Sequence, residues 1–294
     1  MTETDMKRTI IMRTLSLSLL LTAVLASSGC EETPTAETYR REVVISGVLT
    51  AGRSVDTIKV SWTGVVDQRY DLSALAITDA VVVVREVGGT FADTLVYDPS
   101  VPGRYFSPDT ARKILPTRTY ELTVRTVTPE ARTVSAVTTV PDEFAITTST
   151  LTDGGTVKYD VTAPVHSFAW TPSASYGTYL PTITYLDSGA AMIPKIFYQD
   201  TLSADFQRPD KVGYRIGLPP TQLSTELPWI FLSYYGTVRF DVYAIDVNYS
   251  DFINQYIPAQ GGELREIRYR TVGGIGVFGS RTAARNPITV RLVP

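Results

Sequence analysis

The two side chains with the widest chemical range occur once each in this sequence, as Cys30 and His166. A disulfide needs two cysteines, a structural zinc site commonly uses four cysteine or histidine ligands, and a catalytic triad pairs its nucleophile with a histidine base. His166 lies between Val165 and Ser167 at the approach to a strand-like run, which favours a structural role over that of a base or ligand. We therefore expect no cofactor and no metal site.

A Gly-x-Gly-x-x-Gly pattern lies within the glycine-rich segment 273–279, after the strand-like run 266–272. A dinucleotide site needs a helix directly after the pattern and an acidic residue about twenty positions further on. Here Arg285-Asn286-Pro287 follows, and no acidic residue occurs after Glu266. The segment is better explained by turns and by close approach of its backbone to another part of the chain.

Residues 246–251, with the sequence Asp-Val-Asn-Tyr-Ser-Asp, resemble the start of a calcium-binding loop, in which oxygen ligands alternate along the chain. Such a loop has glycine at its sixth position and a bidentate glutamate at its twelfth, whereas this sequence has Asp251 and Ile257 there. The pattern therefore favours a helix cap.

Paired carboxylates can catalyse glycoside hydrolysis without histidine or cysteine. The acidic residues are scattered along the chain, so the sequence shows no converging pair. We expect the protein not to be an enzyme, and a two-carboxylate hydrolase remains the alternative from another class. The net charge of −3 disfavours a nucleic-acid partner, because such partners bind basic surfaces.

Aromatic side chains form the remaining candidate site for binding a ligand. Trp229, Tyr234 and Tyr235 follow Leu227-Pro228 and would suit an aromatic platform for a sugar or a peptide. The competing interpretation is alternate burial of these side chains in a strand.

The elements that must position these residues are strands, because threonine, valine and isoleucine are abundant and fit a pleated sheet. We predict an all-β fold in which residues 41–141 form an immunoglobulin-like β-sandwich. Tyr120 begins one alternating run and resembles a tyrosine corner, whose hydroxyl bonds backbone a few residues upstream. The seven expected strands are 43–49, 57–62, 80–87, 94–97, 104–106, 120–127 and 132–139.

A second domain, fibronectin-like and about twice as rich in aromatic residues, is predicted for residues 142–294, after the interruption at Val140-Pro141. Residues 167–172 resemble the tryptophan-bearing second strand of fibronectin-type sandwiches, and residues 238–246 resemble their penultimate strand. A short helix is expected near residues 250–258, with Ser250 as its cap and Pro258 close to its end. A turn of helix is also expected within residues 73–79.

The N-terminal segment predicts the location of the protein. Three basic residues precede the apolar run 15–25, and small residues follow it, so residues 1–29 read as a secretory signal. The sequence Ser-Ser-Gly-Cys that ends at Cys30 resembles a bacterial lipobox, whose cysteine is lipidated, although position 27 has serine where leucine is usual. Residues 30–40 would then be a tether between the lipid and the first sandwich.

Several of these features together resemble the Bacteroidota lipoproteins of the domain-of-unknown-function 4249 family. They are Cys30, the early strand 43–47, Gly103-Arg104-Tyr105, the strand at 120–124 and the terminal glycine-aromatic motif 273–279. The resemblance covers nearly the whole mature chain and carries over no catalytic residue.

That resemblance implies a lipid-anchored accessory protein of the outer membrane, on its periplasmic or cell-surface face, beside a TonB-dependent receptor. An independent glycan- or peptide-binding surface lipoprotein remains the alternative within the same class.

Overall fold

The computed structural model describes residues 39–65, 68–175, 177–188, 191–193, 213–215, 221–260 and 269–294. The chain forms two compact units, Met1–Arg40 and Arg41–Pro294, and the second unit contains all the helices and strands named here. The predicted all-β fold is confirmed, since strands dominate the described ranges, which contain two α-helices. No helix in the described ranges is long and apolar enough to cross a membrane.

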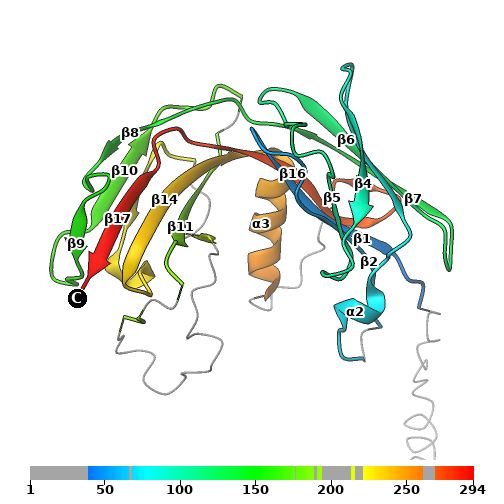
Figure 1. Cartoon of the computed structure of the whole chain (residues 1–294), viewed down its shortest axis with the longest axis horizontal. Coiled ribbons are helices and arrows are strands. Elements are labelled where there is room, and N and C mark those ends of the chain that lie inside the picture. The colour runs from blue at the N-terminus through cyan, green and yellow to red at the C-terminus, as the bar shows by residue number, and fades with distance from the viewer. Residues whose placement is uncertain are drawn as a thin grey trace, which may run out of the picture. The chain divides into compact units, whose positions relative to one another are not determined.

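The elements are named as in Figure 1. They are β1 (Val43–Thr50), β2 (Ile58–Trp62), α2 (Leu72–Leu75), β3 (Val81–Glu86), β4 (Ala92–Tyr97), β5 (Arg104–Phe106), β6 (Thr119–Thr126), β7 (Arg132–Thr139), β8 (Ile146–Ser149), β9 (Thr156–Lys158), β10 (His166–Trp170), β11 (Tyr179–Tyr185), β12 (Gly213–Arg215), β13 (Ser224–Leu227), η3 (Trp229–Phe231), β14 (Gly236–Ile245), α3 (Val247–Gln260), β15 (Thr271–Val272), β16 (Ile275–Ala283) and β17 (Ile288–Val293).

The first sandwich contains all seven predicted strands, each within two residues of its expected ends. One sheet has the order β1-β2-β5-β4 and the other has the order β3-β6-β7, while β4 also pairs with β3. In chain order these are strands A-B-E-D and C-F-G, the arrangement of a constant-type immunoglobulin domain. Alternate side chains of both sheets, among them Ile45, Val60, Val84 and Leu122, meet in one buried cluster.

The predicted tyrosine corner is confirmed. Tyr120 is the second residue of β6, is fully buried, and accepts a hydrogen bond on its hydroxyl from the backbone N–H of Leu115 at 2.9 Å. The second half of the chain contains a similar bond, which was not predicted from the sequence. There the backbone N–H of Ser173 donates to the hydroxyl of Tyr179, at the start of β11, at 2.9 Å.

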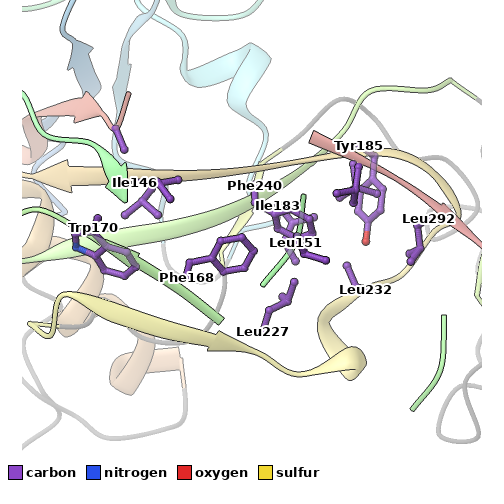
Figure 2. Close-up of a cluster of buried hydrophobic side chains, with 14 of the residues drawn as sticks. Ile146, Leu151, Phe168, Trp170, Ile183, Tyr185, Leu227, Leu232, Phe240 and Leu292 are labelled. Carbon is purple, nitrogen blue, oxygen red and sulfur yellow. The ribbon is translucent and has the colours of Figure 1, made fainter. Parts of the chain in front are cut away.

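The second sandwich sets the three-stranded sheet β13-β10-β8 against β12-β11-β14, to which β17 and β9 add. As predicted, the tryptophan-bearing segment forms a strand, β10, which is central in its sheet, and residues 238–245 belong to β14, which ends one residue before Asp246. Figure 2 shows Phe168 and Trp170 of β10 in one cluster with Ile183 and Phe240 of the facing strands. The rings of Phe168 and Phe240 lie 5.3 Å apart between centroids.

Strand β16 belongs to both sandwiches, which a division of the chain into 41–141 and 142–294 does not anticipate. Residues 275–281 run parallel to residues 44–50 of β1, and residues 281–283 pair antiparallel with β14. Phe278 enters the buried cluster of the first sandwich. Figure 1 shows β16 alongside β1, with α3 next to it. The C-terminal part of the chain therefore completes the first sandwich as well as the second.

Helix α3 begins at Val247, three residues earlier than predicted, and reaches Gln260, two residues beyond Pro258. Asp246, rather than Ser250, caps it, because an Asp246 carboxylate oxygen accepts the backbone N–H of Tyr249 at 3.0 Å. Ser250 instead donates its backbone N–H to the Asp246 carbonyl at 2.9 Å. The expected turn of helix in the first sandwich is α2, with Asp71 as its cap.

Candidate functional site

Trp229 and Tyr234 lie in the core of the second sandwich, so the predicted aromatic platform is not a surface. Trp229 is 5% exposed and Tyr234 is 3% exposed, while Tyr235 packs partly buried against the same cluster. The indole N–H of Trp229 donates to the carbonyl of Ala163 at 3.1 Å. The ring of Tyr234 packs edge-on against Tyr185, with centroids 5.1 Å apart. The competing interpretation, in which these aromatic side chains are buried rather than available to a ligand, therefore describes Trp229 and Tyr234.

The neighbours of Trp229 carry the exposed apolar surface instead, because residues 229–231 form a turn of 3-10 helix rather than a strand. Ile230 is 52% exposed and Phe231 is 40% exposed. The Trp229–Ala163 hydrogen bond holds this turn against the loop before β10, where Val161 is 66% and Val165 is 41% exposed. We call these four side chains the apolar loop surface.

His166 contributes to packing beneath this surface. Its ring lies edge-on to Trp229 with centroids 4.9 Å apart, and its Nδ1 is 3.3 Å from the Thr150 hydroxyl. Desolvation by burial lowers the pKa of His166 below its usual 6.5. Its Nε2 is buried and has no hydrogen-bond partner among the residues that the structure describes. A neutral, packed imidazole fits the predicted structural role.

A groove of about 560 Å³ lies over the three-stranded sheet. Hydroxyl and amide side chains from all three strands and from the approach to β13 give it hydrogen-bonding capacity. Glu226 is the one carboxylate among its described lining residues, so a pair of acids that could perform hydrolysis is not assembled in this groove. The lining residues are Thr148, Ser167, Phe168, Ala169, Gln222, Ser224, Thr225 and Glu226.

The glycine pattern packs its backbone against the first sandwich, as predicted. A side chain at Gly276, which has φ 119°, would place Cβ 1.9 Å from the carbonyl oxygen of Ile45. At Gly279 a Cβ would come within 2.7 Å of the Tyr249 Cβ on α3. A strand rather than a helix follows the glycines, so no helix N-terminus is available for a pyrophosphate.

Asp246 links both sandwiches through its carboxylate and is 1% exposed. Besides capping α3, it accepts the backbone N–H of Ser280 on β16 at 3.0 Å and the hydroxyl of Thr138 on β7 at 2.7 Å. Desolvation by burial raises its pKa above the ordinary 3.8, although these hydrogen bonds act in the opposite direction. The sequence identified a cap in this segment but not its role between the sandwiches.

No cluster of three or more metal-ligating side chains occurs among the described residues.

Cys30, the signal segment and most of the tether lie outside the described residues, so the predicted lipidation site stays a prediction.

No family model and no curated protein matches the chain. Among solved structures, it is similar to the FN1–FN3 domains of chicken CNTN1, with 15% identity and a TM-score of 0.25. That match covers 69% of this chain and 60% of the CNTN1 chain. A segment of two fibronectin type III domains from chicken tenascin has 10% identity and a TM-score of 0.20, and covers 69% of this chain and 89% of the tenascin chain. At these TM-scores neither match transfers a function or a partner.

Proposed function

We propose that this protein is a lipid-anchored, non-catalytic accessory protein of the outer membrane that binds a TonB-dependent receptor through its apolar loop surface. The observation that supports contact with a protein is the exposure of Val161, Val165, Ile230 and Phe231 on two loops held together by Trp229. Exposed apolar side chains gathered on neighbouring loops are typical of protein or membrane contact sites. The signal segment and Cys30 support the location.

The apolar loop surface is fixed before a partner arrives, which favours binding because little conformational entropy is lost. Trp229 is buried against Tyr159 and His166, with ring centroids 5.5 Å and 4.9 Å away. Its position in turn fixes Ile230 and Phe231, the next two residues of the same short turn. An aromatic side chain such as Phe231 is a common anchor in protein interfaces.

The anchor would come from acyl chains on Cys30, each contributing roughly 0.8 kcal/mol per buried methylene, so that several chains hold the protein firmly to a bilayer. The tether then gives the folded part freedom to meet a receptor in the same membrane.

A mild-detergent pull-down of the tagged protein from its own outer membrane tests the proposal. We expect a TonB-dependent receptor in stoichiometric amount with the natural chain, and at least about tenfold less with the double variant Ile230→Ser and Phe231→Ser, since a central apolar anchor is commonly worth 2 kcal/mol or more. Val127→Ser is the matched control, because Val127 is 61% exposed on the first sandwich. Recovery of no receptor, or equal recovery with the double variant, would overturn the proposal.

The anchor is tested separately with Cys30→Ser. We expect this variant to leave the membrane fraction, and an unchanged membrane fraction would refute lipidation.

A glycan- or peptide-binding lipoprotein is the second candidate, supported by the polar groove beside the edge strand β13. The backbone N–H of Trp170 donates to the carbonyl of Leu223, so Leu223 directs its backbone groups towards β10. Because successive residues of an antiparallel strand direct these groups to alternate sides, those of Ser224 and Glu226 point away from β10. Binding of an extended chain at this edge would be seen in glycan and peptide arrays with the purified protein. Ser224→Pro, which introduces a ring and removes an edge N–H, should abolish such binding, whereas Ile230→Ser should not.

A further inference from the structure

A cluster of arginines gathers around Tyr243 where β14, β16 and the turn after β1 meet. Tyr243 and Ala283 are directly paired, and so are Ile245 and Arg281, which places Tyr243 and Arg281 on the same face of the sheet. The guanidinium carbon of Arg281 lies 4.3 Å from the centroid of the Tyr243 ring. Such a distance is typical of a cation–π contact.

Arg281 is held in place by groups that leave part of its guanidinium unused. Its Nε donates to the hydroxyl of Thr50 at 3.1 Å, and the ring of Tyr243 covers one face. In the described part of the chain, no carboxylate lies within 4.0 Å of the Arg281 nitrogens. Both terminal nitrogens therefore remain for an anion, and a guanidinium binds oxyanions through such a fork.

Two further arginines lie nearby in the fold. Arg239 lies on β14, four residues before Tyr243, and its Nε donates to Asp241 at 2.8 Å. Arg53 is exposed in the turn after β1, whose Ala51 N–H donates to the Arg281 carbonyl at 2.9 Å. No described carboxylate forms an ion pair with Arg53.

The electrostatics at Tyr243 agree with this geometry. Burial raises its pKa above the usual 10.0, and Asp241 raises it further. The positive charges of Arg281, Arg239 and Arg53 act in the opposite direction. With Asp241 as the one carboxylate among these groups, the cluster carries a local excess of positive charge on a chain whose net charge is −3.

We propose that Arg53 and Arg281, with Tyr243 beside them, form a binding site for a small oxyanion, the phosphate or carboxylate group of a ligand. The side of the site towards α3 is apolar, because Tyr243 and Tyr249 pack there against Leu180, Ile245 and Ile253. A ligand that carries its anionic group on a compact apolar or sugar body fits these surroundings.

The test measures binding of inorganic phosphate and of glucuronate to the purified soluble form by calorimetry at low ionic strength. We expect saturable binding of at least one probe, and preference between the two distinguishes a phosphate ligand from a carboxylate ligand. Arg53→Ala should weaken binding about tenfold, the loss expected for one charge-assisted hydrogen bond, because that side chain is exposed and forms no described bond on which folding depends.

Arg281→Lys keeps the charge and removes the fork, so it should also weaken binding while the circular dichroism and melting temperature report whether the junction with Thr50 is intact. Arg125→Ala, which removes an exposed arginine from β6 of the first sandwich, is the matched control and should leave affinity within about twofold of the natural chain. Absence of saturable binding, or equal loss with Arg125→Ala and Arg53→Ala, would overturn the proposal.

Discussion

Thr138 on β7 donates its hydroxyl hydrogen to Asp246 Oδ2 at 2.7 Å, and both side chains are buried. This contact joins the last strand of the first sandwich to the beginning of helix α3 in the second half of the chain. Asn248, the second residue of the helix, adds side-chain hydrogen bonds to the carbonyls of Val137 and Phe278, at 2.6 and 2.9 Å. The two sandwiches are therefore connected by buried polar bonds in addition to the shared strand β16.

Replacement of Asp246 should weaken this connection in proportion to the hydrogen bonds lost. Asp246→Ala leaves the backbone N–H groups of Tyr249 and Ser280 without their acceptor, so we expect the free energy of unfolding to fall by about 2–4 kcal/mol. Asp246→Asn keeps an acceptor oxygen for these groups and should cost less. Urea denaturation of both variants measures the difference, and equal losses would contradict this role for the carboxylate.

The pH dependence of stability should carry a contribution from Asp246. Burial raises the pKa of Asp246 in the folded chain, so the folded state holds the proton more tightly than the unfolded state does. Its contribution is therefore fully present below the ordinary pKa of 3.8 and is lost as pH rises through the higher pKa of the folded state.

Asp98 and Asp160 act in the opposite direction, because hydrogen bonds from Ser100 and Thr162 lower their pKa values. The Asp246 contribution is therefore isolated as the difference between the natural chain and Asp246→Asn, measured by urea denaturation from pH 4 to 8. As pH rises, the free energy of unfolding of the natural chain should fall relative to that of Asp246→Asn. A constant difference would show that the carboxyl does not titrate in this range.

Close approach at Gly276 should make this position intolerant of any side chain. Gly276→Ala combines an unfavourable positive φ with a Cβ 1.9 Å from the Ile45 carbonyl oxygen, so we expect a loss of about 3 kcal/mol or more from strain and displacement of β16 from β1. Gly52→Ala is the matched control, because Gly52 has φ 74° and open space around its Cβ direction. Thermal unfolding compares the two, and similar losses would show that backbone conformation alone matters.

Trp229 should matter for stability rather than for surface recognition. Trp229→Ala removes a side chain that is 5% exposed, so we expect the free energy of unfolding to fall by about 3–5 kcal/mol. The variant also loses the hydrogen bond to the Ala163 carbonyl, so the loop that contains Ala163 should loosen. Phe231→Ser removes a side chain that is 40% exposed and should change stability by less than about 1 kcal/mol. Chemical denaturation distinguishes them, and a stable Trp229→Ala variant would contradict the buried position.

The sequence alone was sufficient for features that depend on local pattern. Runs of β-branched residues separated by turn residues located the seven strands of the first sandwich, because β-branched side chains fit a pleated sheet. Tyr120 was identified as a corner from its place at the start of an alternating run, and the segment around Trp170 was assigned to a strand because it resembles the tryptophan-bearing second strand of fibronectin-type sandwiches. The predicted all-β class follows from the same residues.

Only the tertiary structure decided which distant segments meet. A strand pattern specifies the two faces of a strand and not its neighbour, so nothing local at 275–281 selects β1, more than two hundred residues earlier, as its partner. The same limit applies to Phe231: in a strand Trp229 and Phe231 would share a face, whereas the turn of 3-10 helix buries Trp229 and leaves Phe231 40% exposed. Arg281 and the turn that carries Arg53 likewise belong to separate elements, and they meet because β16 pairs with β1.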